Sequence, residues 1–164
     1  MRPVPVPAGP GQESVWDYPR PPRVEHVDVR VTIDLGGERV VDTRDVVRVL
    51  ETSHPPVYYL PIAAFRADAL VAADGASFCE FKGAARYHSV RGGGTVAERA
   101  AWNYPSPSPG FESLADRVAV YAGPMDACTV DGERVVPQPG RFYGGWITSN
   151  VVGPFKGGAG SLGW

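Results

Sequence analysis

The chain has 164 residues, of which 43% are hydrophobic and 21% charged, enough for one domain with its own hydrophobic core. Its formal net charge of -2 at pH 7 gives no broad electropositive surface, which argues against nucleic acid as a partner. No apolar run approaches the ~18 residues that a membrane span needs, so no membrane partner is expected either.

The composition favours strands and turns over helices. The chain contains 20 Gly and 17 Pro, residues that break helices and form turns. The N-terminal sequence lacks the apolar run of a signal peptide, which predicts a cytoplasmic protein. Cys79 and Cys128 are the only cysteines, and in that compartment both are expected to be free thiols.

Three regions differ in their patterns. Residues 1–25 are rich in proline and predict an arm, which Trp16 and Tyr18 would hold across the domain. Residues 26–136 carry the strand patterns and predict a β domain. Residues 137–164 are rich in glycine and large aromatic rings, which predicts a tail packed on that domain.

The first strands are predicted by alternation and by glycine. Residues 27–34 alternate valine or isoleucine with polar side chains, the period of one half-buried strand. Gly36 and Gly37 predict a tight turn, after which residues 38–43 return and residues 45–52 form a third strand. Residues 58–60 continue in extended form, and residues 62–73 have the composition of one or two helical turns.

The middle of the chain predicts a long hairpin. Residues 84–102 run out and back around Gly92, Gly93 and Gly94. With all three glycines in the loop, Tyr87 would lie opposite Arg99. The same register would place His88 opposite Glu98.

The later segments are shorter. Ser108 and Pro109 suit the start of a short helix through Leu114. Residues 118–121 predict a strand, and Asp131-Gly132 predicts a hairpin turn. The fold class that follows is mainly β, a compact antiparallel two-sheet domain, β-tent-like or barrel-like, with one or two short helices.

Residues 51–61 form the densest group of chemically active side chains. Glu51, His54, Tyr58 and Tyr59 lie on backbone stiffened by two prolines, so they could be positioned for acid/base chemistry. The alternative is a proline-defined turn with half-buried rings and a surface histidine.

Two further groups carry the same ambiguity. Lys82 precedes a glycine at a strand entrance, where it can act as a point charge for an anion or be a solvated turn lysine. Cys79 is either a nucleophile or a small buried hydrophobe. Trp102 and Tyr104 precede a proline and form either a ligand-binding aromatic wall or a cap on the core.

Several specific chemistries lack their sequence motifs, and no metal or cofactor is predicted. Two distant cysteines and three scattered histidines do not make a zinc pattern. No phosphate-binding loop or nucleophile elbow occurs. Asp42 and Asp45 would point to opposite faces of a strand, which argues against a two-carboxylate magnesium site. The tripeptide Phe-Lys-Gly occurs at 81–83 and 155–157, but three letters are too few to indicate a repeat.

Together, residues 54–61 (HPPVYYLP), 77–87 (SFCEFKGAARY) and 101–105 (AWNYP) resemble a bacterial family known as domain of unknown function 427, sometimes labelled nucleotidyltransferase-like. The resemblance covers roughly residues 27–130, and the arm and tail look like an extended variety. It implies a compact β fold similar to a zinc-free β-tent, and a ligand cleft where the three segments converge. The residues it implies for that cleft are Tyr59, Cys79, Lys82, Tyr87, Trp102 and Tyr104.

The resemblance supplies no activity, and catalytic residues are not predicted. The first hypothesis is a domain that binds a small molecule in an aromatic pocket with Lys82 at its mouth. The second is an enzyme that uses the same cleft, with Glu51 or His54 as acid or base. The third is a protein-interaction module that uses the arm or the tail. The sequence predicts no particular ligand or oligomeric state.

Overall fold

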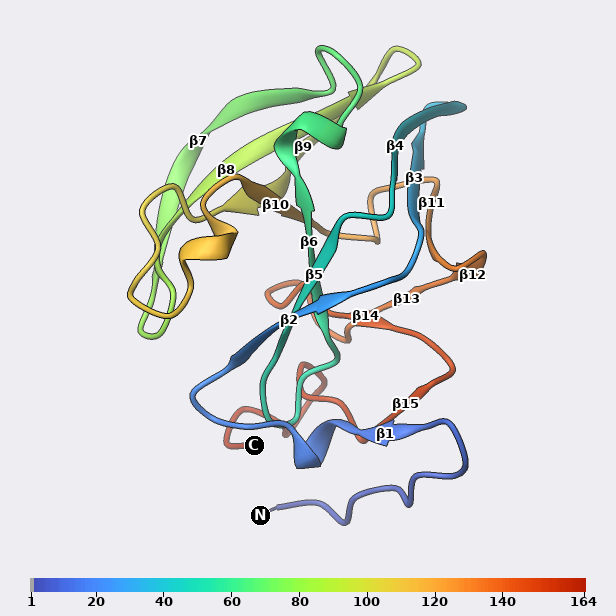
Figure 1. The fold of residues 1–164 in the computed structure, drawn as a ribbon, viewed down its shortest axis with the longest axis vertical. Coiled ribbons are helices and arrows are strands. Elements are labelled where there is room, and N and C mark those ends of the chain that lie inside the picture. Colours follow the sequence, from blue (N-terminus) through green and yellow to red (C-terminus); the bar gives the residue numbers. More distant parts are fainter. Residues whose placement is uncertain (1) are drawn as a thin grey trace.

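Two antiparallel sheets make up most of the computed structural model, which describes residues 2–164 (Figure 1). The larger sheet has seven strands, in the spatial order β2 (Arg23–Val27), β5 (Val46–Leu50), β6 (Val57–Pro61), β10 (Arg117–Val120), β9 (Thr95–Asn103), β8 (Gly83–Gly92) and β7 (Leu70–Cys79). The smaller sheet has four, in the order β12 (Glu133–Arg134), β11 (Ala127–Val130), β3 (Val31–Leu35) and β4 (Glu38–Thr43).

Two short strand pairs join distant parts of the chain. Near the termini, β1 (Glu13–Ser14) runs parallel to β15 (Val151–Val152), and β13 (Val136–Pro137) pairs with β14 (Trp146–Ile147). The two ends of the chain therefore lie together at the foot of the molecule (Figure 1).

Strands form 45% of the chain and helix only 6%, and the sheets do not close into a barrel. The prediction of a mainly β antiparallel fold is confirmed. The helices are single 3-10 turns, η1 (Val15–Asp17), η2 (Ile62–Ala64) and η3 (Glu112–Leu114). Among residues 2–164, no helix has the length and hydrophobicity that crossing a bilayer would require.

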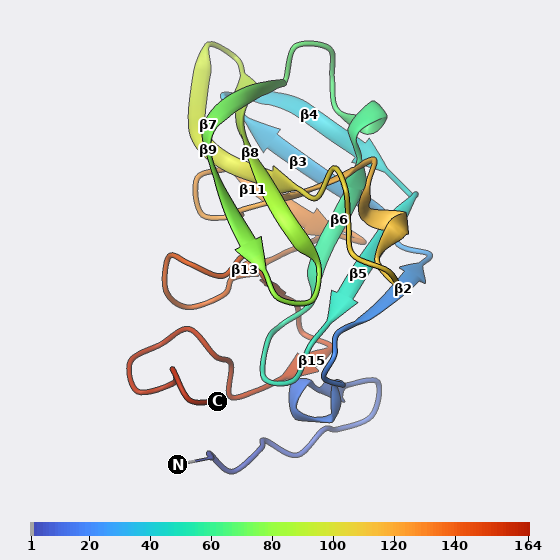
Figure 2. The same cartoon turned by 90° about the vertical axis from the view of Figure 1, so that its left-hand side faces the viewer.

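The main core lies between the two sheets, and alternation along the strands decides what it contains. Tyr58 and Leu60 of β6 face this core, while Tyr59 faces the opposite side of the larger sheet. Figure 2 shows β7, β8 and β9 in front of β3 and β4, the two layers that enclose the core. The opposite face of the larger sheet carries a second apolar cluster, which becomes the floor of the candidate site.

One predicted strand is in fact two. Residues 27–34 were expected to be continuous, but β2 ends at Val27 in the larger sheet and β3 begins at Val31 in the smaller one. The chain changes sheets at Arg30, whose backbone N–H donates to Asp131 Oδ1 at 2.8 Å. The valine alternation continues through the change because both strands present side chains to the same core.

The predicted helix at 62–73 is mostly wrong. Only Ile62–Ala64 form a 3-10 turn, and the chain is in strand β7 from Leu70 onward. Pairing of Leu70 with Val90 of β8 outweighs the helix propensity of the alanines, because burial and ladder hydrogen bonds exceed a weak local preference. The helix predicted from Ser108 is likewise reduced to the single turn η3.

The glycine hairpin is confirmed, but its register was wrong. Gly92 pairs with Thr95, so only Gly93 and Gly94, both with positive φ, form the turn. A bulge follows, in which Arg99 has a φ of 54°. The observed pairs are Tyr87 with Trp102 and His88 with Ala101, in place of Arg99 and Glu98. The turns at Gly36-Gly37 and Asp131-Gly132 occur where they were predicted.

Trp146 joins the C-terminal segment to the main core. Its side chain is 1% exposed and stacks on Tyr58 with ring centroids 5.2 Å apart. Its Nε1–H donates to the Val120 carbonyl oxygen at 2.9 Å. Both the ring and its hydrogen bond are therefore satisfied inside the protein.

We expect Trp146→Ala to lower the free energy of unfolding by about 3–5 kcal/mol, since it leaves a large cavity and an unpaired buried carbonyl. Urea unfolding followed by circular dichroism measures this loss. Phe142→Ala is the matched control, because that ring belongs to the same segment but is 75% exposed; its effect should stay within about 0.5 kcal/mol. Equal losses for the two variants would contradict the assignment of Trp146 to the core.

Candidate functional site

A cavity of about 330 Å³ opens on the outer face of the larger sheet. All six residues that the family resemblance implied for a cleft line it: Tyr59, Cys79, Lys82, Tyr87, Trp102 and Tyr104. Glu51 and His54, the predicted acid/base candidates, line it as well. The structure brings these side chains together from segments up to 53 positions apart, and their role in binding stays a prediction.

Strand register builds the floor of this cavity. Tyr87 of β8 pairs with Trp102 of β9, which in turn pairs with Ala119 of β10. Ala119 follows the Val118–Leu60 pair, so it lies beside Tyr59 of β6. Since paired residues share a face, three aromatic rings and a small alanine form one row across four strands. The methyl group of Ala119 leaves the large rings room to lie over the sheet.

Further rings extend this row into walls. Tyr104 lies two residues after Trp102, on the same face, and its ring centroid is 6.4 Å from that of Tyr59. Trp102 and Tyr121 have ring centroids 4.6 Å apart. Burial raises the pKa of Tyr59, Tyr104 and Tyr121 above the ordinary value of 10.0. The walls are therefore neutral at physiological pH, apolar in body and polar at the hydroxyl tips.

Lys82 lies on the tight turn between β7 and β8. Cys79 pairs with Gly83, which leaves Glu80, Phe81 and Lys82 as the turn. Gly83 has a φ of 109°, a conformation that residues with side chains rarely adopt. The Lys82 carbonyl accepts a hydrogen bond from the Ser108 N–H at 2.9 Å, and its Nζ lies 5.9 Å from the centroid of the Tyr104 ring. The backbone thus fixes the base of a half-buried lysine at the cavity.

His54 is buried. The alternative interpretation of residues 51–61, which placed this histidine at the surface, is therefore wrong. Gln138 determines its tautomer, because Gln138 Oε1 accepts from the Gly145 N–H at 2.9 Å and its Nε2 donates to the Lys156 carbonyl at 2.8 Å. The amide nitrogen of Gln138 is therefore the donor to His54 Nδ1 at 3.0 Å. The imidazole proton then sits on Nε2, which is 3.7 Å from Glu51 Oε2.

Charge and burial together keep His54 neutral. Burial lowers its pKa from the ordinary 6.5 to about 4, and the positive charges of Lys156, Arg20 and Lys82 act in the same direction. A neutral imidazole in an electropositive cavity binds protons weakly. It can donate a hydrogen bond through Nε2 without adding charge.

The second wall comes from the C-terminal segment, which the sequence had not assigned to the site. Gln138, Tyr143, Gly144 and Lys156 all line the cavity. Gly144 lies against Trp102 so closely that a Cβ there would be 2.1 Å from the indole ring. Lys156 Nζ lies 5.7 Å from the Tyr143 ring centroid. Of these four residues, only Lys156 belongs to a pattern noted in the sequence, the second Phe-Lys-Gly tripeptide.

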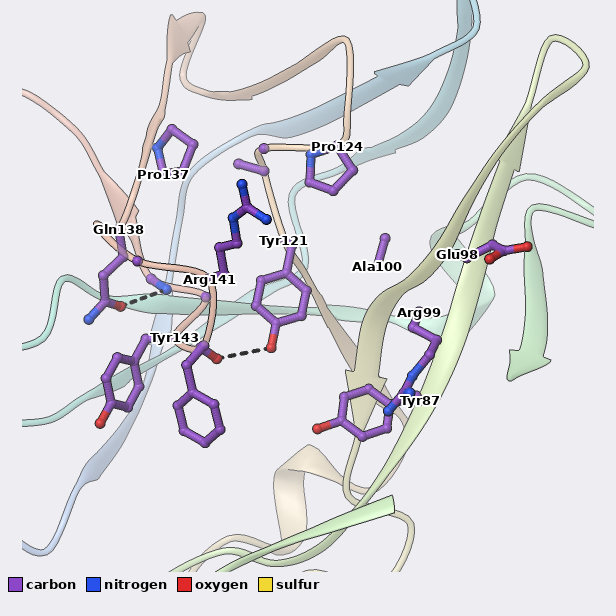
Figure 3. A pocket seen from close by; sticks show the side chains of 16 residues that line it. Tyr87, Glu98, Arg99, Ala100, Tyr121, Pro124, Pro137, Gln138, Arg141 and Tyr143 are labelled. Atoms are coloured by element: carbon purple, nitrogen blue, oxygen red, sulfur yellow. Dashed lines mark hydrogen bonds between the residues drawn. The ribbon is translucent and has the colours of Figure 1, made fainter. Parts of the chain in front are cut away.

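A larger cavity of about 530 Å³ adjoins the first and shares Tyr87, Tyr121 and Tyr143 with it. Figure 3 shows the Tyr121 hydroxyl directed at the backbone of the segment that carries Arg141 and Tyr143, where it donates to the Phe142 carbonyl at 3.0 Å. The guanidinium of Arg99 lies over the ring of Tyr87, 4.8 Å from its centroid. Because the titratable groups discussed above converge on the smaller cavity, we take that one as the candidate site.

Neither thiol is in a disulfide. Cys79 is half-buried at the cavity, whereas Cys128 lies in the core, where burial raises its pKa to about 12. Across residues 2–164, no group of three or more His, Cys, Asp or Glu side chains is placed to hold a metal ion.

Comparison with protein families gives one finding. Residues 23–131 match the model of a family described as a domain of unknown function (DUF427), in agreement with the resemblance of the three sequence segments. A search of curated proteins found no match. The match includes β2 through β11 and ends before Gln138, Tyr143 and Lys156.

The depressed pKa of His54 predicts a pH dependence of stability. The unfolded chain binds a proton near pH 6.5 and the folded protein only near pH 4, so stability should fall as pH drops through this window and level off below it. The loss should be on the order of 3 kcal/mol.

His54→Asn is the matched control for this prediction, because the Asn amide oxygen can still accept from Gln138. Urea unfolding of both proteins at several pH values measures the effect. The stability difference between wild type and variant should change across pH 6.5 to 4. A constant difference would show that His54 titrates normally.

Proposed function

Because the chain belongs to the domain of unknown function 427 family, whose description names no activity, we propose a function from the cavity itself: the domain binds a small molecule between aromatic walls, with Lys82 meeting an anionic or carbonyl group at the mouth. The single observation that carries the proposal is the convergence of three separate sequence segments on one cavity.

The chemistry of the lining supports a planar ligand. Tyr87, Trp102 and Tyr104 offer ring faces and edges, which bind flat apolar bodies. Polar groups that could orient a ligand also line the cavity, and they include the His54 Nε2–H and the Lys82 ammonium. A volume of about 330 Å³ is at the lower end of the range for such pockets.

We expect Lys82→Ala to weaken binding of 2-naphthoate, a planar aromatic carboxylate, by about tenfold or more, since it removes a charge-assisted hydrogen bond. The measurement is the ligand-induced shift in melting temperature, supported by isothermal titration calorimetry. The ligand-free melting temperature should change little, because the variant keeps the Lys82 carbonyl that accepts from Ser108 and loses only the 5.9 Å contact of Nζ with the Tyr104 ring.

Arg86→Ala is the matched control for Lys82→Ala. Arg86 lies exposed on β8 and outside the cavity, so its loss removes the same charge without touching the site. Its binding should equal that of the wild type. If Lys82→Ala lowers only the ligand-free stability, Lys82 is a structural lysine and the proposal fails.

The alternative is an enzyme that uses Glu51 or His54 as acid or base, and the 3.7 Å approach of their side chains inside the cavity favours it. Against it, a histidine with a pKa of about 4 is a weak base near neutral pH, and Gln138 already occupies its Nδ1. For these reasons binding is the preferred function.

The enzyme alternative predicts turnover that depends on His54. Hydrolysis of 2-naphthyl acetate, followed by release of 2-naphthol, should then be lost in His54→Asn and retained in Arg86→Ala. Turnover that is absent, or equal in the two variants, would remove this alternative and leave the binding function untouched.

A further inference from the structure

The N-terminal arm and the C-terminal segment are joined to each other. β1 of the arm pairs with β15 at the foot of the molecule (Figure 1). Trp16 adds side-chain contacts, since its Nε1–H donates to the Pro154 carbonyl oxygen at 2.9 Å and its ring centroid lies 5.7 Å from that of Trp164. Residues 2–22 precede the family match at 23–131 and the C-terminal segment follows it, so both sides of this joint lie outside the matched domain.

The joint has an apolar cluster of its own. Val15, Trp16 and Tyr18 of the arm are all buried, and they pack with Leu50 of β5 and Val151 of β15. Burial of this much apolar surface holds the arm against both strands. The arm is therefore fixed relative to β5, whose chain continues directly into the turn that carries the site histidine.

A charged contact holds the arm as well. Arg48 Nη1 donates to Glu13 Oε1 at 2.7 Å, and the Tyr18 hydroxyl donates to the same oxygen at 2.6 Å. The Arg48 side chain is only 11% exposed, so the surrounding protein shields this ion pair from water and salt. Arg48 also reaches Glu25 Oε1 at 2.8 Å, which leaves it a partner if Glu13 loses its charge.

A series of hydrogen bonds runs from the arm to the cavity. The Val15 carbonyl oxygen accepts from the Ser53 N–H at 3.0 Å, and the Ser53 carbonyl oxygen accepts from the Lys156 N–H at 2.9 Å. The Lys156 carbonyl oxygen accepts from Gln138 Nε2 at 2.8 Å, and the same nitrogen donates to His54 Nδ1. The arm is thereby connected to His54 and Lys156, which line the cavity, although none of its described residues does.

Ser53 is the link in this series that depends most on the arm. It has a φ of 72°, which is uncommon for a residue with a side chain, and it is fully buried. Among residues 2–164 its hydroxyl has no hydrogen-bond partner, so its backbone bonds to Val15 and Lys156 are what hold this conformation. Without the Val15 carbonyl, a buried N–H would be unpaired and the turn that carries His54 would relax.

We propose that the arm is a positioning element of the candidate site: docked on the C-terminal segment, it fixes Ser53 and through it holds His54 and Lys156 at the cavity. The inference rests on the proposed binding function and adds its regulation by a segment that does not line the cavity. Docking of the arm and binding of the ligand then stabilise each other, because coupling between two equilibria is reciprocal. Trp16 is a positioning residue, since it acts through the backbone of other residues.

Titration of His54, followed by NMR of the full chain, tests the positioning without a ligand. Trp16→Ala should raise the pKa of His54 from about 4 towards 6.5, because a relaxed turn admits water to the imidazole. Trp16→Phe keeps a ring in the joint and should retain most of the wild-type behaviour. Leu35→Ala is the matched control, since it removes a buried side chain from the main core, and it should leave the pKa of His54 near 4.

Binding of 2-naphthoate, measured by isothermal titration calorimetry, tests the coupling. Trp16→Ala should weaken it about tenfold or more, whereas Leu35→Ala should bind as the wild type does. Val4→Ala is the control within the arm, because that side chain is 87% exposed, and it should also bind normally. In the wild type, saturating 2-naphthoate should slow hydrogen exchange of the Glu13 amide, which donates to the Asn150 carbonyl oxygen, by about the factor that Trp16→Ala costs in affinity.

Glu13→Gln decides the matter if Trp16→Ala does not fold. It removes the charge that faces Arg48 and leaves the apolar cluster of the joint intact. We expect faster hydrogen exchange of the arm, a higher pKa of His54 and weaker binding, each in the direction given for Trp16→Ala but smaller. Faster exchange of the arm with neither of the other two changes would show that the arm is only structural, and would overturn the inference.

The outcomes separate this inference from the proposed function. If Lys82→Ala weakens binding and Trp16→Ala does not, the site stands and the positioning role of the arm is overturned. If Lys82→Ala binds 2-naphthoate as the wild type does, the proposed function fails. The titration of His54 in Trp16→Ala then still decides whether the arm positions the turn, because it needs no ligand.

Discussion

The contact of Trp102 with its neighbours is the constraint on which the site depends. Its strand pairing places it between Tyr87 and Ala119 in the floor of the cavity, and its ring packs against Tyr121. On its outer side the ring meets Gly144, where no side chain would fit. The same indole therefore sets the floor of the cavity and the distance at which the C-terminal segment closes over it.

The electrostatics of the site follow from this enclosure. Tyr59 and Tyr104 in its lining stay protonated because burial raises their pKa, and burial is also the main cause that lowers the pKa of His54 and keeps it neutral. Lys82 and Lys156 line the same cavity, and so do Glu51 and Glu80.

The C-terminal segment has two separate tasks. Trp146 fills the main core between the sheets, a contribution to stability. Gln138 orients His54 and holds the Lys156 carbonyl, a contribution to the geometry of the cavity. Because the anchor and the site residues lie on one continuous segment, packing of the anchor brings the second wall into place.

The sequence alone predicted the β class and the turns at Gly36-Gly37 and Asp131-Gly132, because alternation and turn chemistry are local features. Family motifs, which are also local, pointed to the six residues that line the cavity. Only the tertiary structure decided where the first strand changes sheets, that residues 70–73 are strand, and how the hairpin pairs. It alone placed Lys156 in the lining of the cavity that Lys82 also lines, because that placement depends on how the C-terminal segment packs onto Trp102, and no local pattern encodes this packing.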